Sequence, residues 1–124
     1  MKIETAGIVS HKYGTKFCVI AREQDKKRVH IYSVGDNATV NSVELLAMKF
    51  AALGAKAENI IISTPNQYVS NMLKYKTDGK EITWELNPKS NKELVEEVRE
   101  LVIEKDLQVV FDKSDEARQL CREK

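Results

Sequence analysis

The short apolar run NIIIS, at residues 59–63, constrains the fold more than any other feature of the sequence. A strand with apolar residues at successive positions is buried on both faces, as in the middle of a parallel sheet. Parallel neighbours need a crossover connection, which is usually a helix. Because a helical pattern precedes the run, we expect an α/β fold in which this strand lies beside the first strand through a right-handed crossover.

Three runs rich in β-branched and aromatic residues come first, at residues 2–10, 15–23 and 28–34. Turn-like residues separate these runs, at 11–14 and 24–27. Short strands joined by tight turns are typical of an antiparallel meander. The sequence therefore predicts three antiparallel strands before the first helix.

Helical spacing replaces strand alternation after Asn41. Apolar residues recur three or four positions apart from Val43 to Leu53, and Gly54 supplies a C-terminal stop, so we expect a helix over residues 42–53. The later expected elements are a helix at about 65–75, a turn at 76–80, an exposed strand or extended connection at 82–86, a helix opened by a capping box of Ser90 and Glu93, a strand at 107–111 and a helix at about 115–122. No repeat or linker interrupts this order, so residues 1–124 are expected to form a single domain.

The composition argues against several functional classes. Lysine and arginine number 20 against 19 aspartates and glutamates, so the net charge of +1 gives no bulk attraction to nucleic acid or to an anionic membrane. Cys18, Cys121, His11 and His30 lack the spacing of zinc or redox motifs, and both thiols are expected to be reduced. The sequence has no signal segment and no run of ~20 apolar residues, so we expect a soluble, cytoplasmic protein without a membrane contact or a cofactor.

The order of these elements resembles that of the type 1 ribonuclease H family, and two local segments carry the resemblance further. Residues 41–47, NSVELLA, are similar to the opening of the family's first helix, and residues 63–69, STPNQYV, are similar to a strand-to-helix turn of the family. The resemblance runs from Lys2 to about Cys121. It implies a ribonuclease H-like α/β fold with a five-stranded mixed sheet, three antiparallel strands followed by parallel strands, flanked by helices.

The resemblance also bears on activity, because the family cleaves the RNA strand of an RNA/DNA hybrid with two divalent cations. Several converging carboxylates must hold such a pair of ions. Of the family's four acid positions, the resemblance keeps one, Glu44, and places Ala6, Pro65 and Arg118 at the other three. Alanine and proline offer no oxygen ligand, and an arginine repels a dication. The loop before the last helix, which carries a histidine in the family, is reduced here to residues 112–114. The resemblance therefore implies a pseudoenzyme without a catalytic metal site.

Two of these positions also fit local roles in helix capping. Glu44 follows Asn41 by three residues, where a glutamate can close a capping box, and we favour this role over metal binding. Thr64 and Gln67 have the same spacing, and Pro65 would then occupy the first helical position. Helix initiation thus accounts for both segments without any metal.

A relocated metal site is the alternative that would preserve catalysis. Glu4 lies two residues from Ala6 and so shares its face of the strand, and Asp112 or Asp115 at the end of the last strand could approach Glu44. Exposed acids at the ends of strands and helices are common, and we favour solvated charges at these positions.

Seven residues are candidates for contact with nucleic acid: Lys26, Lys27, Arg28, Thr39, Asn41, Gln67 and Asn91. The three cations lie at a predicted hairpin tip and could contact phosphates. The four polar residues enter through the resemblance alone. The other interpretation is that the cations solubilise a turn and that Asn41 and Gln67 cap helices.

These observations predict a catalytically inactive ribonuclease H-like domain that binds nucleic acid or a protein. Its partner would be an RNA/DNA hybrid or duplex, another protein, or a second copy in a homodimer. Two alternatives remain open: an active ribonuclease H with a relocated metal site, and a purely structural dimerisation scaffold.

Overall fold

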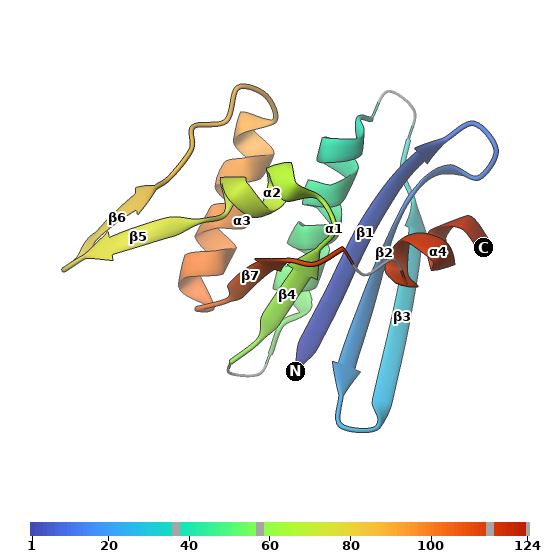
Figure 1. Ribbon diagram of the computed structural model, residues 1–124, viewed down its shortest axis with the longest axis horizontal. Coiled ribbons are helices and arrows are strands. Elements are labelled where there is room, and N and C mark those ends of the chain that lie inside the picture. The colour runs from blue at the N-terminus through green and yellow to red at the C-terminus, as the bar shows by residue number, and fades with distance from the viewer. Residues whose placement is uncertain (36–37, 57–58, 114–115, 124) are drawn as a thin grey trace.

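A computed structural model describes residues 1–35, 38–56, 59–113 and 116–123. Five strands form the main sheet in the order β3-β2-β1-β4-β7 (Figure 1). Their bounds are Lys2–Ser10 for β1, Gly14–Glu23 for β2, Lys26–Ser33 for β3, Ile61–Thr64 for β4 and Gln108–Phe111 for β7. The first three strands pair antiparallel, whereas β4 runs parallel to both β1 and β7. This arrangement confirms the predicted mixed sheet and places the strand of the NIIIS run between two parallel neighbours, although Ile61 is 37% exposed and the run is therefore not buried throughout.

The helices are α1 (Val40–Gly54), α2 (Gln67–Met72), α3 (Lys92–Glu104) and α4 (Glu116–Glu123). α1 packs against β1, β2 and α3 on one face of the sheet, and α4 packs against β1 and β2 on the other (Figure 1). Among the described residues, no helix is both long and apolar enough to cross a membrane.

The two faces of β1 alternate between two apolar cores, as the period of two in a strand requires. Ile3 belongs to the large core shared with α1 and α3, whereas Ala6 and Ile8 belong to a smaller core beneath α4. Gly7 faces α1: a Cβ there would lie 2.7 Å from Val43 Cγ1 and 3.1 Å from the backbone nitrogen of Glu44. The absence of a side chain at Gly7 therefore lets the α1 backbone lie directly on the strand.

The smaller core brings together the two cysteines, which are remote in sequence. Cys18 of β2 and Cys121 of α4 are both free thiols and fully buried. A hydrogen bond with Cys18, together with burial, raises the pKa of the Cys121 thiol. The pair therefore contributes apolar packing between α4 and the sheet.

The cap predicted for α1 is wrong. The N-cap is Thr39, whose Oγ1 accepts a hydrogen bond from the Ser42 backbone N–H at 3.1 Å, and Ser42 Oγ accepts from the Thr39 N–H at 2.9 Å. Asn41 and Glu44 thus lie inside the helix and form no capping pair. Gly54 is its last residue and not the stop beyond it.

The caps predicted for α2 and α3 are also wrong. Asn66 caps α2 by accepting a hydrogen bond from the Val69 N–H at 3.2 Å, so Pro65 precedes the cap and does not occupy the first helical position. Asn91 precedes α3 in a left-handed conformation and makes no side-chain capping bond among the described residues. The predicted box of Ser90 and Glu93 is therefore absent from this part of the chain.

Residues 75–84 form a hairpin of β5 (Tyr75–Asp78) and β6 (Glu81–Trp84), which projects from the body beside α2 and α3 (Figure 1). The predicted strand at 82–86 is confirmed in part, but the predicted turn at 76–80 shrinks to the residues around Gly79, which has a φ of +64°. The Tyr75 and Trp84 rings lie 5.1 Å apart, and the Arg99 guanidinium lies 4.5 Å from the centre of the Trp84 ring. These contacts hold the base of the hairpin to α3.

Candidate active-site edge

The candidate site lies where β4 ends beside the longer β1. In the described residues, the two strands pair only over Lys2–Glu4 of β1 and Ile61–Ser63 of β4. β1 continues to Ser10, so the edge that faces β4 loses its strand partner after Glu4. We call this stretch, from Thr5 to Gly7, the open edge of β1.

Glu44 reaches the open edge from α1. Its Oε1 accepts a hydrogen bond from the Gly7 backbone N–H at 2.8 Å, and its Oε2 accepts one from Thr64 Oγ1 at 3.3 Å. The residue is completely buried. A buried backbone N–H needs a partner, so the Glu44 carboxyl supplies the acceptor that a longer β4 would have supplied. Capping, the role favoured from the sequence, is therefore replaced by a link between helix and sheet.

The environment of Glu44 favours its protonated form. Burial raises the pKa of Glu44 to about 7, although the Gly7 N–H, the positive charge of Arg118 and the Thr64 hydroxyl act in the opposite direction. Near neutral pH, part of the population therefore carries a neutral carboxyl. A single carboxyl supplies one or two of the roughly six oxygen ligands that a hard divalent cation takes.

Two of the three positions matched to missing acids are neighbours in sequence of the groups that bond this carboxyl, and the third acts on it through its charge. Ala6, next to Gly7, is completely buried under α4, and Pro65 follows Thr64 where β4 ends. Arg118, on α4, contributes a positive charge that acts on Glu44. Of these four described residues, Glu44 supplies a carboxyl and Arg118 a positive charge, whereas Ala6 and Pro65 offer no side-chain oxygen ligand.

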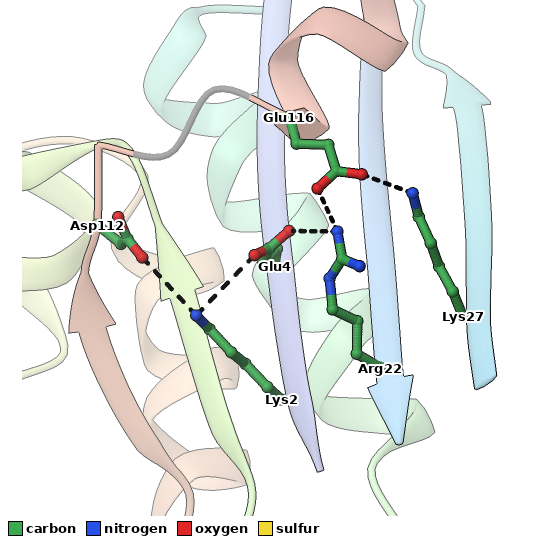
Figure 2. Close-up of polar contacts among 6 residues, drawn as sticks. All are labelled: Lys2, Glu4, Arg22, Lys27, Asp112 and Glu116. Atoms are coloured by element: carbon green, nitrogen blue, oxygen red, sulfur yellow. Dashed lines mark hydrogen bonds and ion pairs between the residues drawn. The ribbon is translucent and has the colours of Figure 1, made fainter. Parts of the chain in front are cut away.

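Two of the acids proposed for a relocated metal site, Glu4 and Asp112, take part in an ion-pair network that lies next to the open edge (Figure 2). Glu4 directly precedes the open edge, and the Asp112 backbone N–H donates a hydrogen bond to the Thr64 carbonyl at 3.0 Å. Lys2 Nζ lies 4.0 Å from Glu4 Oε1 and 3.9 Å from Asp112 Oδ2, so this lysine stands between the two acids. Asp115 falls outside the described residues. Within the described chain, no group of three or more His, Cys, Asp or Glu side chains could hold a metal ion.

Arg22 extends the same network to α4. Its guanidinium lies 3.6 Å from Glu4 Oε2 and also pairs with Glu116, which pairs in turn with Lys27 (Figure 2). Hydrogen bonding to Lys27, with help from Arg22, lowers the pKa of the Glu116 carboxyl. The network therefore links β1, β2 and β3 to α4.

The structure divides the candidates for nucleic-acid contact among several places. Thr39 caps α1, and Asn41 Oδ1 accepts a hydrogen bond from Asn66 Nδ2 at 2.8 Å, next to the exposed Gln67. Asn91 lines a separate hollow at the start of α3. Asn66 was assigned no role from the sequence alone, although asparagine is a preferred N-cap residue and Asn66 lies at the start of the predicted helix.

The three cations of the predicted hairpin tip face opposite ways. Lys27 points to the α4 face, where it pairs with Glu116. Lys26 and Arg28 line a hollow on the α1 face together with His30 and Phe50, neither of which was assigned a binding role from the sequence. The alternation of Lys26, Arg28 and His30 along one strand was the signal that could have identified this surface.

Comparison with known proteins supplies the fold but no closer relationship. No family model matches the chain, and no curated protein sequence matches it. Among solved structures, it is similar to LC11-RNase H1 in complex with an RNA/DNA hybrid, with 15% identity over 95% of this chain and 88% of that one and a TM-score of 0.69. The fold is ribonuclease H-like.

Two further structures agree with this ribonuclease H-like fold. RNase H1 from the halophilic archaeon Halobacterium salinarum NRC-1 is 16% identical over 94% of this chain and 88% of that one, with a TM-score of 0.67. The foamy viral protease-reverse transcriptase in complex with dsDNA is 15% identical over 98% of this chain and 87% of that one, with a TM-score of 0.63. At such identities the similarity concerns the fold and leaves activity to the residues of the site.

Proposed function

We propose that this chain is a ribonuclease H-like domain that binds nucleic acid without cleaving it. The observation that carries the proposal is the set of residues at the open edge: Glu44 is the one carboxyl kept at the four positions of the resemblance, and Ala6, Pro65 and Arg118 occupy the other three. Two-metal hydrolysis requires several ionised carboxylates that converge on the ions. One carboxyl of this kind does not meet that requirement.

The same features favour a polyanionic partner. An edge with several ionised acids and no metal would repel phosphates, whereas one partly neutral carboxyl beside Arg118 does not. Asn41 and the exposed Gln67 lie at the first turns of α1 and α2, where hydrogen-bonding side chains can reach a duplex. Two of the similar proteins were solved in complex with nucleic acid, one with an RNA/DNA hybrid and one with dsDNA. These points support a duplex-binding domain over a purely protein-binding one.

The test is incubation with a labelled RNA/DNA hybrid in Mg²⁺ or Mn²⁺, with binding followed by fluorescence anisotropy. We expect salt-dependent binding that persists in EDTA, and no cleavage. Gln67→Ala should weaken binding about fivefold, the usual effect of losing one hydrogen bond, whereas the exposed Gln119→Ala on α4 should not change it.

Other outcomes would identify the alternatives. Cleavage that Glu44→Gln abolishes would contradict the proposal and establish a relocated metal site. A failure to bind hybrid or duplex, combined with a dimer in light scattering, would contradict it in favour of a dimerisation scaffold.

A further inference from the structure

A second surface lies at the opposite end of α1 from Glu44. α1 packs against β1 and β2, and beside it a hollow of about 320 Å³ opens toward the edge strand β3. Apolar side chains form its floor, including Ile3, Val19 and Ala21, and Phe50 forms a wall. This volume falls at the lower end of the roughly 300–1,000 Å³ of small-ligand sites.

Positive charge borders this hollow along β3. Lys26, Arg28 and His30 occupy alternate positions of the strand, so their side chains share the face that lines the hollow. Glu23 is the single acid among its described lining residues. The rim is therefore complementary to an anion, while the floor is complementary to an apolar or aromatic group.

Aromatic rings continue this row beyond the cations. The His30 and Tyr32 rings lie 6.4 Å apart with only 14° between their planes, and the Phe50 ring lies 5.8 Å from His30 and 4.8 Å from Tyr32. Tyr32 retains 42% of its exposure. Exposed rings next to a row of cations form a platform on which unpaired bases stack while their phosphates meet the charges.

We infer that this hollow binds unpaired nucleotides of a single-stranded nucleic acid. One base enters beside Phe50, its neighbour stacks on His30 and Tyr32, and the phosphates contact Lys26 and Arg28. Bases inside a duplex are stacked on each other and cannot reach these rings. The inference goes beyond the proposed function, because it concerns another end of α1 and another form of nucleic acid.

The experiment measures fluorescence anisotropy of a labelled ten-nucleotide oligothymidylate, with the RNA/DNA hybrid as a second probe. The double charge reversal Lys26→Glu and Arg28→Glu should weaken oligothymidylate binding more than tenfold and reduce its salt dependence. The matched reversal of Lys80 and Lys89, which are exposed elsewhere, should change it less than twofold.

A second pair of variants tests stacking. Tyr32→Leu should weaken oligothymidylate binding about fivefold or more, whereas Tyr13→Leu, which removes an exposed ring on the β1–β2 turn, should not. Binding that is equal in the variants and their controls would overturn the inference. So would tighter binding of laurate, an apolar anion without a base, in competition with the oligomer.

The two proposals fail separately. Gln67→Ala should weaken the hybrid alone, and the Lys26 and Arg28 reversal should weaken the oligothymidylate alone. Loss of both probes in the same variant would contradict a distinct single-strand site, whereas absence of hybrid binding with intact oligothymidylate binding would contradict only the proposed function.

Discussion

The two ends of α1 differ in how tightly they are packed. At its start, Glu44 is sealed between helix and sheet, and Gly7 allows backbone to lie on backbone. At its end, Phe50 and Gly54 border a hollow that remains open to solvent beside β3. The comparison indicates that changes near Glu44 alter stability first, whereas changes around the hollow alter binding with little effect on stability.

The largest effect is expected from the titration of Glu44. Its pKa rises from an ordinary 4.5 to about 7 on folding, so the folded state holds the proton more tightly than the unfolded state. The resulting stabilisation is complete below pH 4.5 and is lost as the pH rises through 7, which corresponds to about 3 kcal/mol. Glu44→Gln keeps an acceptor for the Gly7 N–H but cannot titrate, so its free energy of unfolding should lack this decline.

Urea unfolding of both proteins between pH 4.5 and 8.5 measures the difference. Glu81→Gln, at an exposed position of β6, is the matched control and should follow the wild-type profile. If the free energy of unfolding changed with pH in the same way for wild type and Glu44→Gln, this would contradict a raised pKa of Glu44 in the folded state.

An intermediate effect is expected from adding a methyl group at Gly7. A Cβ there meets Val43 and the α1 backbone, and overpacking of this kind costs about 2 kcal/mol. The added Cβ of Gly54→Ala meets nothing within 4 Å, and the change replaces a glycine in the last position of a helix, so it should be neutral or stabilise by up to about 1 kcal/mol. Chemical denaturation of the two variants compares the ends of α1 directly, and equal costs would remove the distinction between them.

The smallest effect on stability is expected at the hollow. Lys26→Ala and Arg28→Ala remove exposed charges, so each should change the free energy of unfolding by less than about 0.5 kcal/mol. Oligothymidylate binding should nevertheless weaken in both. If either variant lost as much stability as Gly7→Ala, this would show that the side chains around the hollow support the fold.

The sheet was predictable from the sequence because its signals are local. Runs of β-branched and aromatic residues between turns predict the first three strands, the apolar run predicts β4, and the order of elements then fixes the neighbours. The caps of α1 and α2 were not predictable, because the start of each of these helices offers two good capping residues two positions apart. These are Thr39 and Asn41 for α1, and Thr64 and Asn66 for α2. The choice within each pair depends on where the helix meets the sheet.

The site was predictable only in part, because some of its features depend on packing between segments that are far apart in the sequence. Motif matches drew attention to Ala6, Glu44, Pro65 and Arg118, but no local pattern reveals that β4 stops short of Gly7 and leaves its N–H to Glu44. The hollow depends on which strands α1 leaves uncovered, and this is a property of packing. The sequence shows the alternating cations Lys26 and Arg28, but not that Phe50 of α1 lies beside them.

The hydrogen bond from the Gly7 N–H to Glu44 has a consequence for interpreting sequences of this fold. The sheet itself calls for an acceptor side chain at this position, which Glu44 provides, since without one the Gly7 N–H would be buried unpaired. Selection for stability alone would therefore favour such a residue with or without catalysis. In a ribonuclease H-like chain, this glutamate by itself is a marker of architecture, and the acids around it must be counted before a nuclease is inferred.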